Sequence, residues 1–204
     1  MDILLVGLIQ KNDSNIGLTN EQVLLDENSK LANIKLNAPI AFYNHANITM
    51  VPIKVDNENQ LVNSKSLSYI RIPVTDGKIP SDDMVNYFVE LVKSRPKNTW
   101  FHFHCKEGIG RTTTFMIMYD MIKNYKQVMA DDIIKRQLLL ANFSEKDIGS
   151  FYNPERASFL ENFYKYCKEN GDNFNIKWSD WKNTFNTSSK IFFPVTSIYQ
   201  NQNI

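Results

Sequence analysis

Residues 105–111 place a cysteine and an arginine at the two ends of a short stretch, C-K-E-G-I-G-R. The aromatic run W-F-H-F-H precedes the cysteine, and the run T-T-T-F-M-I-M follows the arginine. Gly108 and Gly110 permit a tight loop whose backbone N–H groups point inward and bind an anion. The spacing therefore predicts a phosphate-binding loop between a strand and a helix.

Three residues of this loop have complementary predicted roles. The Arg111 guanidinium is a planar fork of donors that suits two oxygens of one phosphoryl group. The inward amides and the N-terminus of the following helix stabilise a thiolate at Cys105, which lowers the pKa of the thiol. A thiolate beneath a bound phosphate is positioned for in-line attack on phosphorus, which forms a cysteinyl phosphate. Thr112 has two interpretations, either donating its hydroxyl to the departing sulfur or capping the helix.

The opposing interpretation is that Cys105 is an inert buried thiol and that the glycines merely turn the chain. His104 is also open, as a residue that helps to hold the thiolate or as a structural residue at a strand end. Glu107 is expected to point to solvent, because an inward carboxylate would repel phosphate. The loop lacks the G-K-[ST] ending of a nucleotide-binding loop and the C-x-x-C of a redox site. The residues expected to form the substrate site are His104, Lys106, Glu107, Gly108, Ile109, Gly110, Arg111 and Thr112.

Hydrolysis through such an intermediate needs a proton donor for the leaving alkoxide and a base for the attacking water, and one carboxyl group can serve both steps. The best candidate is Asp76 in R-I-P-V-T-D-G-K-I-P-S, between a predicted strand and a predicted helix, with Gly77 as a hinge. Asp82 and Asp83 are rivals, although they stand where a helix N-terminus favours acidic side chains. Asp76 therefore joins the cysteine and the arginine as the third predicted catalytic residue.

Basic residues near the loop are candidates for peripheral phosphate contacts, although a residue of this kind is more often just a solvated charge. They are Lys78, Lys106, Lys135 and Arg136. Cys167 lies on an apolar helix stripe and is expected in the core.

The elements that must position these residues follow from apolar periodicity and from cap and stop signals. Strands are expected at Ile3–Ile9, Ile40–Tyr43, Ile48–Ile53, Tyr69–Val74 and Trp100–His104, with a polar loop at Lys11–Gly17, a turn at Asp56–Asn59 and a loop at Thr75–Pro80. Helices are expected from Thr19 to about Leu31, from Ser81 to Arg95, over Thr112–Asn124, from Asp131 to Leu140 and from Pro154 to Gly171. Strands and helices around one strand–loop–helix unit indicate an α/β domain. The tail from Asn173 is not assigned.

Composition is that of an ordinary globular protein, with 204 residues and a net charge of +1. No nucleic-acid partner is expected, and any anion site must be built locally. No apolar run approaches the ~20 residues of a membrane span. The start, MDILLVGLIQ, lacks a basic segment and carries Asp2, so we expect a strand there rather than a signal peptide. The expected location is therefore cytoplasmic, unless a leader is lost. Two isolated cysteines fit a reducing compartment better than one disulfide, and no metal or cofactor is expected.

A resemblance to the bacterial phytase-like cysteine phosphatases rests on W-F-H-F-H-C-K-E-G-I-G-R-T-T-T-F-M-I-M-Y-D-M-I, with Y-I-R-I-P-V-T-D before it and I-I-K-R-Q after it. The match covers roughly Gly17–Gly171 and is densest over Ser68–Gln137. The resemblance implies an α/β protein-tyrosine-phosphatase-like core, with a central mixed sheet flanked by helices. It also implies metal-independent, stepwise dephosphorylation of inositol hexakisphosphate. By position it implies that Cys105 is the nucleophile, Arg111 the phosphate ligand and Asp76 the general acid.

Three departures from the family pattern bear on substrate binding. Gly77 stands where family members commonly carry a histidine, and Glu107 stands where they often carry alanine. The D-L-R-x-E strand of the family and its nearby basic residues are not found. Either the predicted strand Ile3–Ile9 replaces it, or the chain is a shortened form with weakened binding or stability. We expect a single phosphatase domain over residues 1–204, with 172–204 as a C-terminal extension. With fewer basic residues, the binding of a highly phosphorylated ligand should be weakened more than the binding of a singly phosphorylated one.

Three hypotheses for the function remain open from the sequence. The first is a phosphatase of inositol phosphates, which the resemblance favours. The second is a protein-tyrosine phosphatase, which a shallow entrance with aromatic walls would favour. The third is an inactive phosphate-binding module, for which the short N-terminus is the argument.

Overall fold

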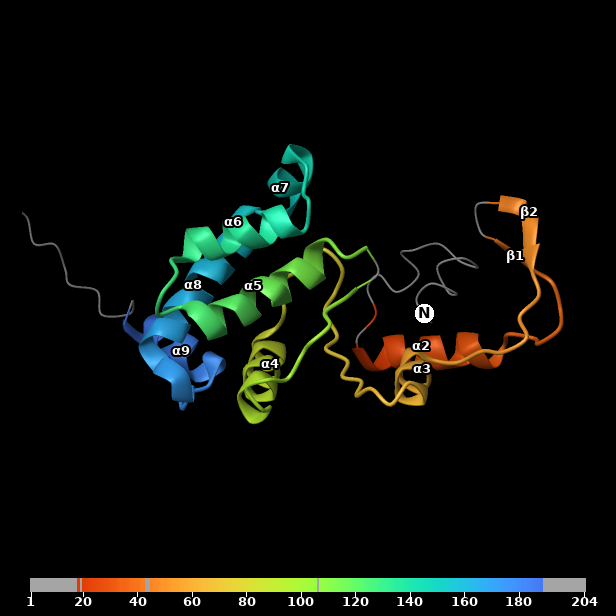
Figure 1. The fold of residues 1–204 in the computed structure, drawn as a ribbon, viewed down its shortest axis with the longest axis horizontal. Helices are drawn as coiled ribbons and strands as arrows, with labels where there is room; N and C mark the ends of the chain where they lie inside the picture. Colours follow the sequence, from red (N-terminus) through yellow and green to blue (C-terminus); the bar gives the residue numbers. More distant parts are fainter. Residues whose placement is uncertain (1–17, 19, 43–44, 106, 189–204) are drawn as a thin grey trace, which may run out of the picture.

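The computed structural model describes residues 18, 20–42, 45–105 and 107–188 of the chain. Figure 1 shows two groups of elements along the long axis of the molecule. The later group comprises α4 (Asp82–Ser94), α5 (Gly110–Asn124), α6 (Ala130–Leu140), α7 (Glu145–Phe151), α8 (Pro154–Asn170), the 3-10 turn η1 (Gly171–Asn173) and α9 (Trp178–Ser188). The N-terminal group comprises α2 (Asn20–Ala32), β1 (Ile40–Phe42), β2 (His45–Met50) and α3 (Glu58–Ser64). The predicted strand Ile3–Ile9 and loop Lys11–Gly17 lie outside the described residues.

The buried core belongs to the later group of helices. Helix α4 shows why, because Val85, Phe88, Val89 and Val92 are buried and recur at the spacing of one helix face. Helix α5 packs against α6 and α8, while α4 packs against α9. Thr112, Thr113 and Thr114 are also buried, as are the apolar residues Phe115, Ile117, Met118 and Met121 of the same helix. Helix α5 is therefore the central helix of this packing.

Predicted helix positions agree with the structure to within a few residues for α2, α4, α5, α6 and α8. Gly171 follows the last residue of α8 with a φ of 63°, a conformation that favours glycine and ends the helix. Ser81 occupies the N-cap position of α4, but its side chain makes no capping hydrogen bond. The strands at β1 and β2 are also confirmed, although β2 begins and ends earlier than predicted.

The prediction of a turn at Asp56–Asn59 is wrong, because α3 begins there. The amide of Gln60 donates to Asn57 Oδ1 at 2.8 Å, and the amide of Asn57 donates to Gln60 Oε1 at 2.8 Å. This reciprocal capping box satisfies two backbone donors at the start of the helix. The polar run that resembles a turn is therefore a helix start.

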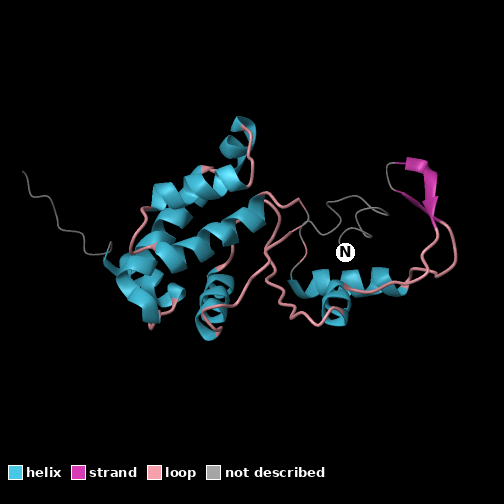
Figure 2. Cartoon of the chain, viewed as in Figure 1, coloured by secondary structure: helices cyan, strands magenta, loops and turns pink. Residues whose placement is uncertain are grey.

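The predicted central mixed sheet is not formed among the described residues. Within this part of the chain, only β1 and β2 pair, antiparallel, with Ile40 opposite Met50 (Figure 2). The predicted strands Tyr69–Val74 and Trp100–His104 run without helix or ladder pairing. Their positions follow from side-chain contacts with the helices rather than from backbone pairing to a neighbouring strand.

Side chains of the second extended segment still alternate between two faces, as a strand requires. Phe101 and Phe103 pack on Tyr119 of α5, with ring centroids 5.4 and 5.7 Å away. His102 and His104 lie on the opposite, exposed face and stack on each other at 5.6 Å. This alternation decides which way the residue after His104 faces.

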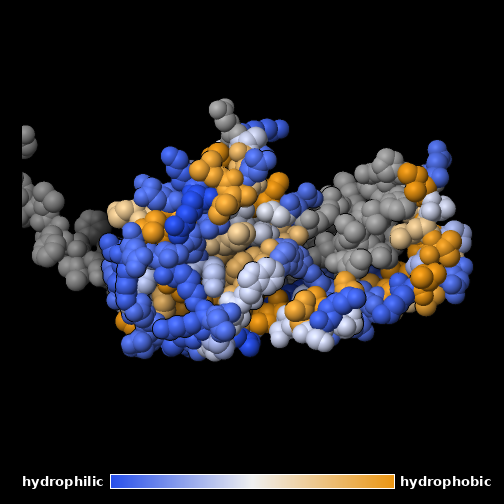
Figure 3. Space-filling view, viewed as in Figure 1, coloured by the Kyte–Doolittle hydropathy of each residue, from blue (hydrophilic) through white to orange (hydrophobic). Residues whose placement is uncertain are grey.

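Apolar residues also gather on the surface of the β1–β2 end of the molecule (Figure 3). Ile48, Val51 and Ile53 are exposed there. This end therefore adds little to the buried core. None of the described helices has the length and apolarity needed to cross a membrane.

Helix α9 was not assigned from the sequence, yet its tryptophans complete the core. Trp178 stacks on Trp181 at 5.4 Å and donates its indole N–H to Asp82 Oδ1 at 2.7 Å. Its ring also meets Phe159 and Phe163 of α8 edge-on or tilted, at 5.7 and 5.8 Å. The C-terminal segment thus joins α4 and α8 into one hydrophobic unit.

We expect Trp178→Ala to lower the free energy of unfolding by about 3–5 kcal/mol, because Trp178 is only 2% exposed. The matched control is Trp100→Ala, since Trp100 is 80% exposed and should cost less than about 0.5 kcal/mol. Urea unfolding followed by far-UV circular dichroism measures both. Similar losses in the two variants would contradict the placement of α9 in the core.

Candidate active site

Cys105 lies at the end of the extended segment, on the same side as the partly buried Phe101 and Phe103. It is half-buried, whereas its neighbour His104 is exposed, as the alternation along the segment requires. Gly108 has a φ of 74°, and added side-chain bulk would meet nothing there, so its backbone conformation alone favours glycine. The turn at Gly108 leads directly into α5, which begins at Gly110.

The surroundings of the sulfur stabilise a thiolate. Burial raises the pKa of the Cys105 thiol. The side chain and amide of Thr112, the amide of Gly108 and the charge of Arg111 together lower this pKa by more than burial raises it. The net pKa of Cys105 therefore lies below that of an ordinary cysteine. The buried Thr112 hydroxyl makes no hydrogen bond of normal geometry within the described residues, so it remains available to an ionised sulfur.

Cys167 differs from Cys105 both in its burial and in the direction of its pKa shift. It is fully buried in α8, at 0% exposure, and burial raises the pKa of its thiol. The structure thus confirms Cys167 as a core residue and makes Cys105 the reactive thiol of the two.

We expect iodoacetamide to alkylate Cys105 first, with a rate that reaches half its maximum at a pH below the pKa of a free cysteine. The direction follows because a lowered pKa keeps the thiolate populated at lower pH. Peptide mass spectrometry over a pH series measures the two sites separately. In Cys105→Ser, the folded protein should react only slowly, through Cys167. A Cys105 midpoint at or above that of a free cysteine would contradict the thiolate assignment.

Asp76 lies close to the phosphate-binding loop through its ion pair with Arg111. Arg111 Nη2 is 3.1 Å from Asp76 Oδ1, and Arg111 Nη1 donates to the carbonyl of Val74 at 3.4 Å. Arg111 Nε is buried and has no partner among the described residues, so it is available to donate to a phosphate oxygen. The structure therefore brings together the three residues predicted to be catalytic.

The turn that carries Asp76 explains why glycine follows it. The amide of Lys78 donates to the carbonyl of Thr75 at 3.1 Å, which closes a turn with Asp76 and Gly77 at its centre. Gly77 has a φ of 73°, the conformation that a type II turn needs at its third position. The Asp76 carboxylate is 80% exposed and projects from this turn.

The rival acid Asp82 is engaged elsewhere. Its carboxylate accepts hydrogen bonds from Trp178 Nε1 and from Lys182 Nζ, both of α9. This carboxylate stabilises the contact between α4 and α9. Asp83 is exposed in the first turn of α4 and remains a comparison for the acid assignment.

His104 contacts α3 rather than the loop. Its Nε2 atom is 2.5 Å from Glu58 Oε1, and the other oxygen of Glu58 accepts from the Tyr69 hydroxyl at 3.1 Å. Glu107 is exposed, as predicted, and Lys106 lies outside the described residues. A substrate-binding role for His104 stays a prediction, and its observed partner favours the structural interpretation.

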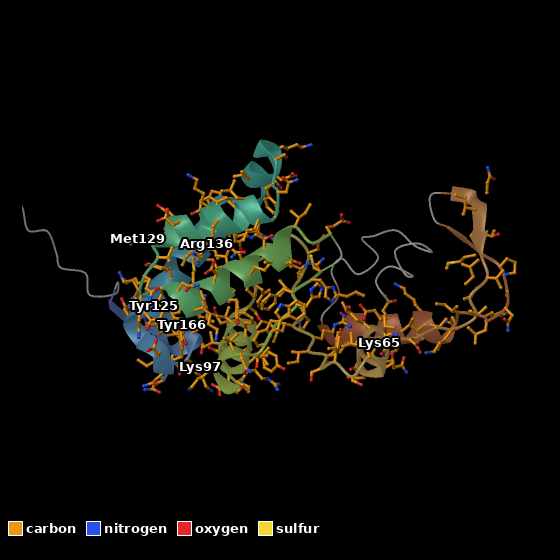
Figure 4. All side chains as sticks on the ribbon, viewed as in Figure 1. Lys65, Lys97, Tyr125, Met129, Arg136 and Tyr166 are labelled. Carbon is orange, nitrogen blue, oxygen red and sulfur yellow. The ribbon has the colours of Figure 1, made fainter. Side chains whose placement is uncertain are left out.

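Arg136 is likewise part of the packing between helices rather than of the loop. Arg136, labelled in Figure 4, forms a two-point ion pair with Asp120 of α5. Gln137 also donates to this carboxylate. Burial raises the pKa of Asp120. Hydrogen bonds from Arg136, Gln137 and Asn124 lower this pKa by more, so it lies below that of an ordinary aspartate. This network holds α6 on α5.

One residue near the site was missed from the sequence. Arg156 of α8 is buried and donates from Nη2 to the carbonyl of Gly77 at 3.3 Å. A Cβ on Gly110 would lie 4.0 Å from the same nitrogen. The contact joins the chain just after Asp76 to the start of α5, and no local sequence signal reveals it.

Known proteins similar to this chain point to one family. The family model for PTP-like phytases matches residues 12–123, more than half of the chain. The description of this family names inositol hexakisphosphate. A PTP-like phytase from Bdellovibrio bacteriovorus is 32% identical with a TM-score of 0.70, over 84% of this chain and 66% of that one. A PTP-like myo-inositol phosphatase from Mitsuokella multacida, solved with myo-inositol-(1,3,4,5)-tetrakisphosphate, is 34% identical with a TM-score of 0.68, over 84% of this chain and 32% of that one.

Among curated relatives, the effector protein hopD2 of Pseudomonas syringae pv. tomato is 30% identical over an alignment of 138 residues, which covers 64% of this chain and 30% of that protein. The chain thus spans only part of these relatives. The structural similarities confirm the α/β, protein-tyrosine-phosphatase-like fold class predicted from the sequence. With its loop, its arginine and its family match over residues 12–123, the chain belongs to the PTP-like phytase family.

Proposed function

We propose that this chain hydrolyses phosphomonoesters through a cysteinyl-phosphate intermediate and that its substrates are myo-inositol phosphates. The observation that carries the proposal is the environment of Cys105. Its half-buried sulfur is stabilised as a thiolate by Thr112, Gly108 and Arg111, and Arg111 in turn pairs with Asp76. These contacts support the proposal that Cys105 is the nucleophile, Arg111 the anion ligand and Asp76 the proton donor of one site.

The proposed reaction has two displacements at phosphorus. In the first, the Cys105 sulfur forms a bond to phosphorus while the bond from phosphorus to the leaving oxygen breaks, and Asp76 gives that oxygen a proton. In the second, water attacks the phosphorus, Asp76 takes a proton from the water, and the bond from sulfur to phosphorus breaks. The thiolate is regenerated, and inorganic phosphate leaves.

Two charged groups limit how Asp76 can act. Its carboxylate pairs with Arg111 at 3.1 Å, and a phosphate bound in the loop competes for the same guanidinium. Substrate binding therefore frees the carboxyl group for proton transfer at the leaving oxygen. Arg111 Nε and the amides at the start of α5 then hold the phosphoryl oxygens.

Support for inositol phosphates comes from the family and from a relative. The family description names inositol hexakisphosphate, and the Mitsuokella multacida relative was solved with an inositol tetrakisphosphate. The chain itself has a net charge of +1, so any preference for a polyanion must come from local charge near the loop.

The test is phosphate release by the purified protein from inositol hexakisphosphate and from a phosphotyrosine peptide, with Cys105→Ser as the control. We expect release from the inositol phosphate, at a higher kcat/KM than from the peptide. A higher kcat/KM on the peptide would replace the proposed substrate with phosphotyrosine. Release from neither, with inorganic phosphate still bound, would instead identify an inactive phosphate-binding module.

A further inference from the structure

Arg156 stands at a position where a cation is unfavourable. Pro154 begins α8, and the Asn153 side chain accepts a hydrogen bond from the amide of Arg156 at 3.0 Å, which places Arg156 in the first turn. The N-terminus of a helix carries partial positive charge, so acidic side chains are favoured there and cations are not. The residue is also only 3% exposed. Both facts call for a compensating role.

Compensation does not come from a carboxylate, because none of the ion pairs among the described residues includes Arg156. Its Nη1 atom donates to the carbonyl of Phe151 at 2.5 Å, and the guanidinium lies over the Phe151 ring at 4.7 Å. Nε is buried without a partner in the described part of the chain. Burial lowers the pKa of the guanidinium, and Glu155 offsets this only in part. A buried cation with these partners is costly to retain for packing alone.

The remaining contact of Arg156 points to what it does. Nη2 donates to the carbonyl of Gly77 at 3.3 Å, across 79 residues of sequence, and a Cβ placed on Gly110 would lie 4.0 Å from the same atom. Two different arginines therefore hold two consecutive residues of the turn. Arg111 of α5 pairs with Asp76, and Arg156 of α8 donates to Gly77. When phosphate competes for Arg111, the Arg156 contact remains to hold the turn.

We infer that Arg156 is a positioning residue that fixes the Asp76 turn over the phosphate-binding loop during catalysis. This inference rests on the proposed function, because it assigns Arg156 to the proton-transfer step. A turn fixed at Gly77 keeps the Asp76 carboxyl near the leaving oxygen after its own pairing with Arg111 is lost. The geometry of proton transfer tolerates little displacement.

The inference predicts a loss that depends on the leaving group. An alkoxide, as from an inositol phosphate, needs the proton of the general acid, whereas 4-nitrophenolate leaves readily without it. We expect Arg156→Lys to lower kcat/KM, which reports the first displacement, about 10-fold for inositol hexakisphosphate and less than about threefold for 4-nitrophenyl phosphate. In an Asp76→Asn background, Arg156→Lys should add less than about a twofold change, because the group it positions is gone.

The matched control is Arg136→Lys. This substitution weakens the ion pair between Arg136 and Asp120, which also joins two helices but includes none of the loop residues. It should lower the melting temperature without changing the ratio of kcat/KM values for the two substrates. If Arg156→Lys also leaves that ratio unchanged, the inference is overturned and Arg156 serves stability alone.

A second readout does not require turnover. Hydrogen exchange at the Lys78 amide reports the turn, because this amide donates to Thr75 within it. We expect at least about fivefold faster exchange there in Arg156→Lys and no change in Arg136→Lys. Unchanged exchange at Lys78 would overturn the inference even if the wild-type protein proved inactive. Wild-type inactivity with faster exchange in Arg156→Lys would refute the proposed function and leave the structural contact supported.

Discussion

Cys105→Ser is expected to lower the rate of phosphate release by a factor on the order of 10⁴ or more, as loss of the nucleophile does in other covalent enzymes. The hydroxyl of serine ionises far less readily than a thiol, and the dipoles that lower the pKa of Cys105 do not make up the difference. The loop amides and Arg111 remain in place. Inorganic phosphate should therefore still bind, with an affinity within a few-fold of the wild type.

Two measurements check this expectation together. A malachite green assay measures phosphate release, and isothermal titration calorimetry measures phosphate binding by the folded variant. Cys167→Ala is the matched control, because this thiol is buried in α8 and should not affect turnover beyond its effect on stability. Comparable turnover by wild type and Cys105→Ser would remove the cysteinyl-phosphate mechanism.

Asp76→Asn is expected to lower kcat/KM, which reports the first displacement and not the breakdown of the shared cysteinyl phosphate, by about 10²–10⁴-fold for inositol hexakisphosphate and by much less for 4-nitrophenyl phosphate. The amide keeps the shape of the side chain but provides no proton for the leaving alkoxide. It also removes the carboxylate that pairs with Arg111 at 3.1 Å. Since Asp76 is 80% exposed, solvent screens this pair, and phosphate affinity should rise by no more than about fivefold.

Asp83→Asn is the control for this prediction, because Asp83 is the remaining acid in the same part of the chain and is exposed at the start of α4. Steady-state kinetics with the two phosphate esters distinguish the variants. A loss selective for the inositol phosphate in Asp83→Asn, and not in Asp76→Asn, would transfer the role of general acid to Asp83.

The sequence by itself was enough to predict the chemistry that we propose for the loop. Cys105, Gly108 and Arg111 lie within a few residues of one another, and a loop that runs straight into α5 leaves few alternative arrangements. The ends of helices were similarly readable, because Pro154 and Gly171 act through their own backbone conformations. Local covalent geometry carries such signals, so they do not depend on the rest of the fold. The capping box at Asn57–Gln60 was equally local and could have been found.

Only the tertiary structure decided which distant groups meet. Asp76 was predicted as the acid, but its pairing with Arg111 depends on how the turn packs on α5. Arg156 reaches Gly77 across 79 residues because α8 packs against α5, and neither sequence neighbourhood contains the other. His104 turns toward Glu58 rather than the loop because strand alternation puts it on the face opposite Cys105. The direction and partner of a side chain depend on packing between segments that are far apart in sequence, which local residue patterns do not encode.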